Sequence, residues 1–183
     1  MIKYESTVTV ISTRSMCQTA VMTALICLMT VVPRIPIPLG YAHLGDAVIF
    51  LVILYAGYKE GAIAASLGSA FADLIGGFPL WVIPTIIIKY GMAVIIWEVL
   101  RRHGDVKRVL SLYPLAGLIL SAIWMVIGYT LGGAILYGGL AIGLTAAPGL
   151  IFEGIFNVLV AVGAGLVMEK AGFSVGQYIR KEK

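Results

Sequence analysis

The sequence predicts an all-α integral membrane protein with six membrane-spanning helices in one compact bundle. Of the 183 residues, 60% are hydrophobic and only 12% are charged, too few for the surface of a soluble domain. The mean hydropathy is +1.01. Long apolar runs recur along the chain, and about 20 apolar residues suffice for one membrane-spanning helix. The net charge of +4 comes from short basic clusters between these runs, a pattern that indicates membrane topology and not nucleic-acid binding.

Six apolar runs predict the helices, and residues 1–183 are expected to form a single membrane domain without a linker or an inverted repeat. The second run is short for a bilayer at about 1.5 Å per residue. It is therefore expected to lie in a thinner or water-filled region, or to begin earlier, near Tyr41. The N-terminal stretch is polar, and no secretory signal is expected there. The predicted helices are 15–33, 45–58, 60–77, 80–100, 109–136 and 144–168.

Lysine and arginine residues predict which side of the membrane each loop faces. Six crossings place both termini on one side, where eleven basic residues collect; Arg34 lies on the other side and Lys89 inside a helix. Basic residues favour the cytoplasmic side, so both termini are expected in the cytoplasm. The loops 34–44, 77–80 and 137–143 then face outward and are nearly free of charge. Short loops of this kind can pack down as lids over a cavity that opens outward. The eleven residues are Lys3, Arg14, Lys59, Arg101, Arg102, Lys107, Arg108, Lys170, Arg180, Lys181 and Lys183.

Small residues recur at helical spacing in the first and third runs. Ala20 and Ala24 lie four apart on one helix face, and such pairs let another helix approach closely. They serve either packing inside the protein or docking of a second membrane subunit. Cys17 and Cys27 lie in the same run and are expected as buried free thiols. The third run predicts packing contacts at Gly61, Ala65, Gly68 or Ser69, and Ala72.

Four ionisable side chains fall within or near the ends of apolar runs, where lipid makes them costly and function is the default explanation. Lys89 and Glu153 lie mid-helix; they either pair with each other across the bundle or contact a ligand. Asn157 lies one turn after Glu153 on the same face, so a carboxylate and a carboxamide could read a small polar ring. Asp73 ends the third run, where capping or solvation is expected. Asp46 either caps the second helix or helps to close over a substrate.

Aromatic residues of the outward halves are typical of a belt at the membrane interface. Trp124 is the exception, because it lies well inside the fifth run, where its indole could stack on a flat ligand. The predicted belt consists of Trp81, Trp124, Tyr129 and Tyr137.

Residues 38–50, PLGYAHLGDAVIF, break the apolar pattern and bring Tyr41, His43 and Asp46 close together. A metal site there lacks further ligands, because the other histidine of the chain falls on the cytoplasmic side, so no metal or cofactor is expected. A pair of aspartates, Asp46 with Asp73, could carry out hydrolytic chemistry, and this is the enzymatic alternative. The chain has no G-x-x-x-x-G-K-[ST] loop, so it is not expected to hydrolyse ATP itself.

Two stretches, GYAHLGDAVIFL (40–51) and GAIAASLGSAFADLIGGFPLWVIPTIIIKYG (61–91), resemble the substrate-binding S components of energy-coupling factor (ECF) vitamin transporters. The sequence looks most like the hydroxymethylpyrimidine/pyridoxine (HmpT-like) branch and related riboflavin-type proteins. The resemblance extends over nearly the whole chain, in length, in helix number and in the Ala20 and Ala24 pair.

The resemblance implies a prokaryotic cell-membrane protein that binds one vitamin or precursor near the outer surface. S components associate with a transmembrane T component and two cytoplasmic ATPases that drive import, and Ala20 and Ala24 would face the T component. The loop at 34–44 would cover and gate the pocket, and the loaded subunit is expected to topple in the membrane. The regions that line the pocket in this family correspond here to regions that contain Lys89, Trp124, Glu153 and Asn157, so the resemblance places these residues in the binding site. From the gating stretch it adds Tyr41, His43 and Asp46.

The first expected ligand is pyridoxine or a hydroxymethylpyrimidine-like ring, with riboflavin second, because a carboxylate and an amide suit a small heteroaromatic with hydroxymethyl groups. A stand-alone transporter that uses Glu153 or Asp46 as a proton relay is the first alternative. The others are a membrane-embedded hydrolase built on His43, Asp46 and Asp73, and a purely structural membrane subunit.

Overall fold

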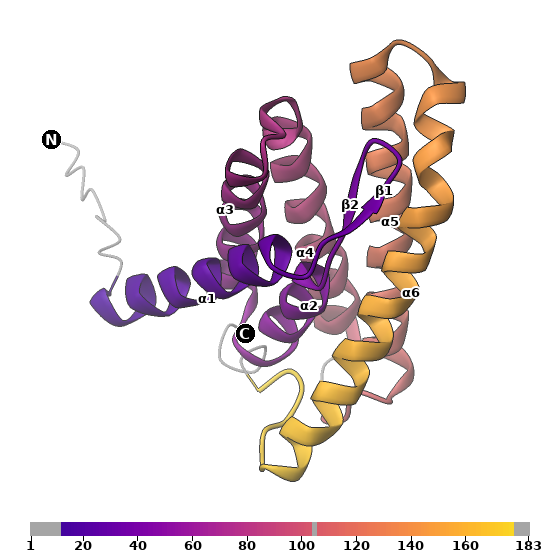
Figure 1. Ribbon diagram of the computed structural model, residues 1–183. Coiled ribbons are helices and arrows are strands. Elements are labelled where there is room, and N and C mark those ends of the chain that lie inside the picture. Colours follow the sequence, from indigo (N-terminus) through magenta and orange to yellow (C-terminus); the bar gives the residue numbers. More distant parts are fainter. Residues whose placement is uncertain (1–11, 104–105, 178–183) are drawn as a thin grey trace, which may run out of the picture.

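Helices dominate the computed structural model of the protein, which describes residues 12–103 and 106–177. In chain order the elements are α1 (Thr13–Val31), β1 (Ile35–Ile37), β2 (Gly40–Ala42), α2 (Gly45–Tyr55), α3 (Tyr58–Gly76), the 3-10 helix η1 (Pro79–Trp81), α4 (Val82–His103), α5 (Leu112–Tyr137) and α6 (Leu140–Lys170). Figure 1 shows α5 and α6 as a long antiparallel pair beside α3 and α4, with α1 projecting to one side. Of the basic residues that predict the orientation, those outside the described residues are Lys3, Arg180, Lys181 and Lys183.

Four helical stretches are long and apolar enough to cross a membrane, and the chain is therefore an all-α membrane protein apart from one short hairpin. The four are α1, Pro79–His103, α5 and α6. Each of the six predicted runs overlaps one of the helices α1 to α6, with bounds that shift by a few residues.

The second helix is short because protein surrounds it. Nine of the 11 residues of α2 are buried, and the helix contacts α1, α3, α4 and α6. At about 1.5 Å per residue it extends only about 16 Å, but a helix enclosed by protein does not need to match the bilayer. The predicted end at residue 58 is wrong. The helix ends at Tyr55 because Gly57 adopts a φ of 118°, where a helix cannot continue.

The small residues of α3 form close packing contacts, as their spacing predicts, and their partner is α1. A side chain at Gly68 would lie 2.7 Å from the backbone oxygen of Thr23, so only glycine permits this approach. Ala65 and Ala72 are fully buried on the same face of α3. The expectation of two buried thiols is wrong. Cys17 is exposed and Cys27 is half-buried, because α1 buries only one of its faces.

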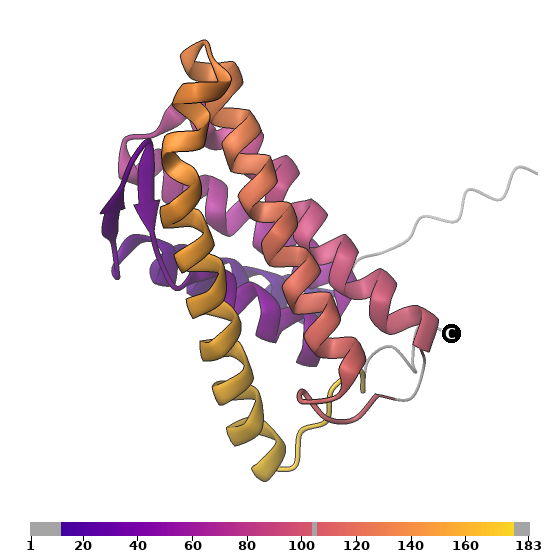
Figure 2. The ribbon, with the colours of Figure 1, turned by 90° about the vertical axis from the view of Figure 1, so that its right-hand side faces the viewer.

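A two-stranded antiparallel hairpin forms where the sequence predicts only a loop. β1 and β2 pair Ile35 with Ala42 and Ile37 with Gly40, joined by a two-residue turn at Pro38 and Leu39. Proline followed by a residue with positive φ is the arrangement of a type II turn. Figure 2 shows the hairpin beside the N-terminal half of α6, which both strands contact.

Candidate functional site

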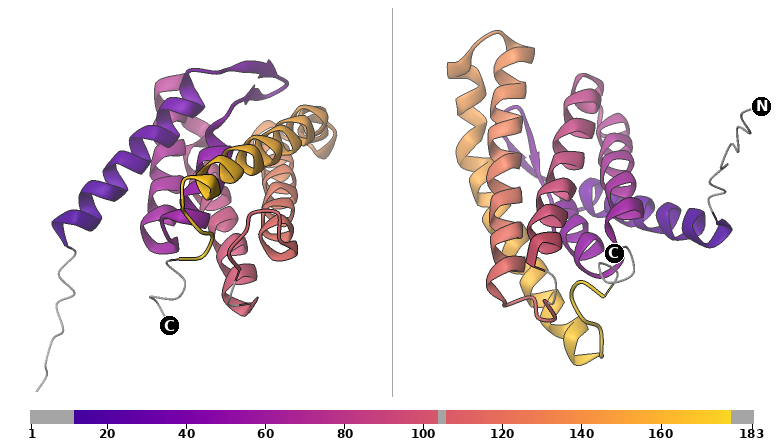
Figure 3. Two further views of the ribbon diagram at one scale, coloured as in Figure 1. Left: turned by 90° about the horizontal axis from the view of Figure 1, so that it is seen from below. Right: turned by 180° about the vertical axis from the view of Figure 1, so that it is seen from behind.

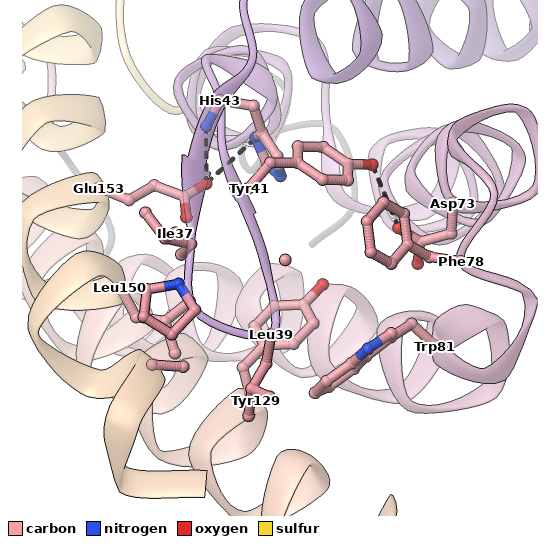
Figure 4. A pocket seen from close by; sticks show the side chains of 13 residues that line it. Ile37, Leu39, Tyr41, His43, Asp73, Phe78, Trp81, Tyr129, Leu150 and Glu153 are labelled. Atoms are coloured by element: carbon pink, nitrogen blue, oxygen red, sulfur yellow. Dashed lines mark hydrogen bonds and ion pairs between the residues drawn. The ribbon is translucent and has the colours of Figure 1, made fainter. Parts of the chain in front are cut away.

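A small cavity lies between the hairpin, the end of α3, η1, α5 and α6 (Figure 4). The space inside that the centres of water molecules can occupy is about 60 Å³, so the hairpin leaves little free volume in it. The lining residues are Ile37, Pro38, Leu39, Gly40, Tyr41, His43, Asp73, Phe78, Trp81, Tyr129, Ala146, Leu150 and Glu153.

The turn of the hairpin forms part of the cavity wall in a strained conformation. Leu39 has a φ of 64°, a left-handed conformation that costs a non-glycine residue roughly 1 kcal/mol or more. Its side chain packs against α5, 3.1 Å from the position that a Cβ would take at Gly133. Packing of the Leu39 side chain against α5 therefore offsets the strain in its backbone. The strained turn is stabilised only while the hairpin lies against α5.

Aromatic rings form one side of the cavity. Trp81 is 6% exposed, its indole N–H donates to the Tyr137 hydroxyl at 3.2 Å, and its ring packs against Tyr129 with centroids 5.5 Å apart. Phe78 packs against Tyr41 at 5.3 Å. The predicted belt role is therefore wrong for Trp81 and Tyr129, which the turn at η1 and the packing of α4 on α5 direct inward.

Trp124 does not lie in the cavity. It is 38% exposed, and its indole N–H donates to the backbone oxygen of Ile88 at 3.0 Å. The glycine at position 91 leaves space for this indole on the face of α4. Trp124 therefore packs on the outside of the α4–α5 pair, where it cannot stack on a ligand bound in the cavity.

His43 and Glu153 meet at the base of the hairpin. The Oε1 atom of Glu153 accepts from the backbone N–H of His43 at 3.3 Å and lies 3.2 Å from its Nδ1. That Nδ1 also accepts from the backbone N–H of Gly45 at 3.1 Å. Burial lowers the pKa of the His43 imidazole from 6.5 to about 4, and the Asp46 carboxylate only partly opposes this shift. His43 is therefore neutral at physiological pH.

Asp46 and Lys89 form a buried ion pair, so the predicted pairing of Lys89 with Glu153 is wrong. Both side chains are 1% exposed, and Lys89 Nζ donates to Asp46 Oδ1. The start of α2 packs between α4 and α6, and Asp46 thereby reaches Lys89 first. The expected N-cap role is also wrong, because Leu44 occupies the cap position and Asp46 lies in the first turn. Neither member of the pair lines the cavity.

Asn157 braces the hairpin instead of lining the cavity. Its Oδ1 accepts from the backbone N–H of Ala47 at 2.8 Å, and its Nδ2 donates to the backbone oxygens of His43 at 2.8 Å and Glu153 at 2.9 Å. One fully buried carboxamide thus ties α6 to both the end of the hairpin and the start of α2.

Tyr41 and Asp73 face the cavity from the other side. The Tyr41 hydroxyl donates to Asp73 Oδ1 at 3.4 Å. Burial, with a contribution from Asp73, raises the pKa of the Tyr41 phenol to about 12, so the phenol keeps its proton. Asp73 is 9% exposed, and the expected solvated or capping role at the end of α3 is wrong. The local sequence pattern does not indicate that η1 and the hairpin bury this end of α3.

The structure brings together only part of the predicted site. Of the seven predicted substrate-binding residues, the cavity is lined by Tyr41, His43 and Glu153, while the other four lie behind or outside it: Asp46, Lys89, Trp124 and Asn157. The prediction missed Trp81, Tyr129 and Asp73 as lining residues, although all three were singled out in the sequence. Because Asp46 is paired outside the cavity and Asp73 lines it, the two carboxyl groups do not form the shared site that aspartate-pair hydrolysis requires. Over the described ranges, no group of three or more His, Cys, Asp and Glu residues is arranged to hold a metal.

Ala20 and Ala24 lie on an open apolar groove between α1 and α3. Figure 3 shows the ribbons of these two helices, which pack against each other. Both alanines are exposed, and the groove is also lined by Ile63, Leu67 and Phe71. The face that carries the small-residue pair is thus not used for packing inside the described part of the chain.

Comparison with known proteins matches the sequence of this chain to a transporter family. The family model of the ECF-type riboflavin transporter S component matches residues 10–170. The chain is also 32% identical over 154 residues to a Pyrococcus woesei protein described as "uncharacterized protein in gap 3′ region"; the match covers 83% of this chain and 92% of the relative. S components are membrane-bound transport subunits, not enzymes, and in general work with T and ATPase subunits. Because the family model covers most of the chain, and because four of its helical stretches are long and apolar enough to cross a membrane, this chain belongs to the ECF-type riboflavin transporter S component family.

Proposed function

We propose that the protein captures a small heteroaromatic vitamin or vitamin precursor beneath its hairpin and delivers it to an ATP-driven importer. The observation that carries the proposal is the small cavity beneath the hairpin, which combines an aromatic wall at Trp81 and Tyr129 with carboxyl groups at Asp73 and Glu153. Flat apolar surface with a few convergent polar groups is typical of small-molecule sites.

The topology that we propose has six membrane crossings, with both termini in the cytoplasm of a prokaryotic cell. Nearly all basic residues then face the cytoplasm, as membrane proteins favour. The hairpin and its cavity face outward, where a vitamin is captured. The short helix α2 crosses inside protein and not against lipid, which allows its length of 11 residues.

A transmembrane T component and two cytoplasmic ATPases are the proposed partners, and the ATPases hydrolyse the ATP. We assign the docking face to the groove between α1 and α3, centred on Ala20 and Ala24. Small exposed side chains let a partner helix approach closely in lipid, where close packing replaces the hydrophobic effect.

The first ligand that we propose is pyridoxine or hydroxymethylpyrimidine, because a single ring suits a cavity of about 60 Å³ better than a tricyclic flavin. This assignment places the chain in the HmpT-like branch. Riboflavin is the second candidate, which the description of the matching family favours. Binding of riboflavin would require the hairpin to lie further from α5 and α6.

The first experiment identifies the ligand. The protein is purified in mild detergent and denatured, and the released small molecules are analysed by mass spectrometry. The empty protein is then titrated with pyridoxine, hydroxymethylpyrimidine and riboflavin. Trp81→Ala should weaken binding roughly tenfold through loss of ring contact, whereas Trp124→Ala, a matched control outside the cavity, should leave binding unchanged. Equal effects of the two substitutions would contradict the assigned cavity.

The second experiment tests coupling. Proteoliposomes that contain the protein with its T component and ATPases should accumulate the identified ligand only when ATP is supplied. Uptake by the protein alone that an uncoupler abolishes would instead establish a proton-coupled transporter.

A further inference from the structure

The carboxyl group of Asp73 has unused hydrogen-bonding capacity that faces the cavity. Its Oδ1 accepts a long hydrogen bond from the Tyr41 hydroxyl at 3.4 Å, and the Thr85 hydroxyl also lies near the carboxyl group. Its Oδ2 is buried and has no hydrogen-bond partner among the described residues. The side chain is 9% exposed and lines the cavity. A buried acceptor without a donor is costly, and such groups in native proteins normally find a partner.

We propose that the ligand donates a hydrogen bond to Asp73, and that Asp73 and Glu153 together select an uncharged or cationic heteroaromatic ring over any anionic one. This inference rests on the proposed function, because it describes the ligand of the same cavity. Asp73 is thereby assigned as a specificity-determining residue.

The two carboxyl groups approach the cavity from different sides. Figure 4 shows Glu153 of α6 and Asp73 of α3 on opposite sides of the view, with the rings of Tyr129 and Trp81 below and between them. A flat ring seated against the aromatic side would therefore present one edge to each carboxyl group. Carboxyl oxygens accept hydrogen bonds, so a ligand with an N–H or O–H group at each edge satisfies both.

The two basic side chains near this cavity, Lys89 and Arg34, do not line it. The lining residues include neither lysine nor arginine. Lys89 is paired with Asp46. Arg34 lies behind the Tyr41 ring at 4.4 Å; its Nη2 donates to the backbone oxygen of Ala72 at 3.5 Å, and its buried Nε has no hydrogen-bond partner among the described residues. A ligand carboxylate or phosphate would thus be buried beside two carboxyl groups without a lysine or arginine in the lining to contact it, which is unfavourable.

The test compares each neutral ligand with its anionic counterpart on the intact protein by titration calorimetry. Pyridoxine is compared with pyridoxic acid, hydroxymethylpyrimidine with the corresponding carboxylic acid, and riboflavin with flavin mononucleotide. The wild type should bind the neutral member at least a hundredfold more tightly. Equal affinities within the pair that binds would overturn the proposal without any substitution, and would leave the proposed function intact. Failure to bind any member of the three pairs would overturn both.

Substitutions assign the selectivity to Asp73. Asp73→Asn can still accept from Tyr41 but presents an amide donor to the cavity, so binding of the neutral ligand should weaken roughly tenfold to a hundredfold. The preference over the anionic counterpart should shrink by at least the same factor, a change that general loosening of the fold would not produce. Ser69→Ala is the matched control, since Ser69 lies one turn earlier in α3, is buried with an unpartnered hydroxyl and does not line the cavity. An unchanged preference in folded Asp73→Asn would overturn the assignment.

Discussion

Asp46 and Asp73 are two buried aspartates near the same hairpin, yet their surroundings give them different roles. Each has an Oδ2 atom without a hydrogen-bond partner among the described residues. Asp46 is enclosed at the start of α2, away from the cavity, and its Oδ1 is paired with the Lys89 ammonium. Asp73 lines the cavity, and its Oδ1 accepts a long hydrogen bond from the neutral Tyr41 hydroxyl. A buried carboxyl group that a fixed cation neutralises stabilises one arrangement of helices. A buried carboxyl group with an unused acceptor beside a cavity can bind a ligand. Burial alone therefore does not identify a binding residue in this protein.

The Asp46–Lys89 pair should give the largest effect. Lys89→Met leaves the Asp46 charge buried and unpaired, which should lower the free energy of unfolding by about 3–5 kcal/mol. The apparent melting temperature of the detergent-solubilised protein measures this loss. The double variant Lys89→Met/Asp46→Leu removes both charges and should regain most of it. If the double variant is no more stable than Lys89→Met, the pair does not act as described.

Acid should loosen the hairpin through His43. The pKa of this imidazole is about 4 in the folded protein and 6.5 in its ordinary state, so the unfolded chain binds more protons between these values. Stability is therefore full above pH 6.5 and is lost as the pH falls from 6.5 towards 4, by on the order of 3 kcal/mol. Melting temperatures measured across this interval should fall more steeply for the wild type than for His43→Gln. Identical slopes would contradict the buried, neutral state of His43.

Asn157 should affect the hairpin more than the ligand. Asn157→Ala leaves the Ala47 N–H and the His43 carbonyl oxygen without their partner, a loss of about 1–3 kcal/mol. A cysteine placed at Leu39, in a background without Cys17 and Cys27, should then react faster with a maleimide. Asn157→Asp retains the acceptor for Ala47 and should lie between the wild type and Asn157→Ala. Unchanged labelling in Asn157→Ala would show that the carboxamide does not hold the hairpin closed.

The α1 groove should give the smallest effect on the isolated protein. Ala24→Trp or Ala20→Trp changes an exposed face far from the cavity, so stability and vitamin binding should remain within error. Co-purification with the T component should fall sharply, because the indole blocks close approach of a partner helix. Ile135→Trp on α5, a position that is 82% exposed, provides the control. Normal co-purification of both alanine variants would remove the groove as the docking face.

The sequence by itself determined the membrane class, the approximate helix positions, the break at the hairpin and the small-residue packing face of α3. Each of these depends on composition or on spacing within one segment, which can be read without knowing the neighbouring helices. It also singled out all but a few of the polar and aromatic residues that surround the cavity.

Only the tertiary structure decided which of these residues face the cavity. The helices α4 and α5 carry apolar residues on every face, and their few polar residues form no continuous stripe that indicates which face points inward. Trp81 therefore lines the cavity while Trp124 packs outside, and Lys89 meets Asp46 instead of Glu153. The rotation of each helix and the place of α2 between α4 and α6 result from long-range packing, which the local pattern of the sequence does not specify.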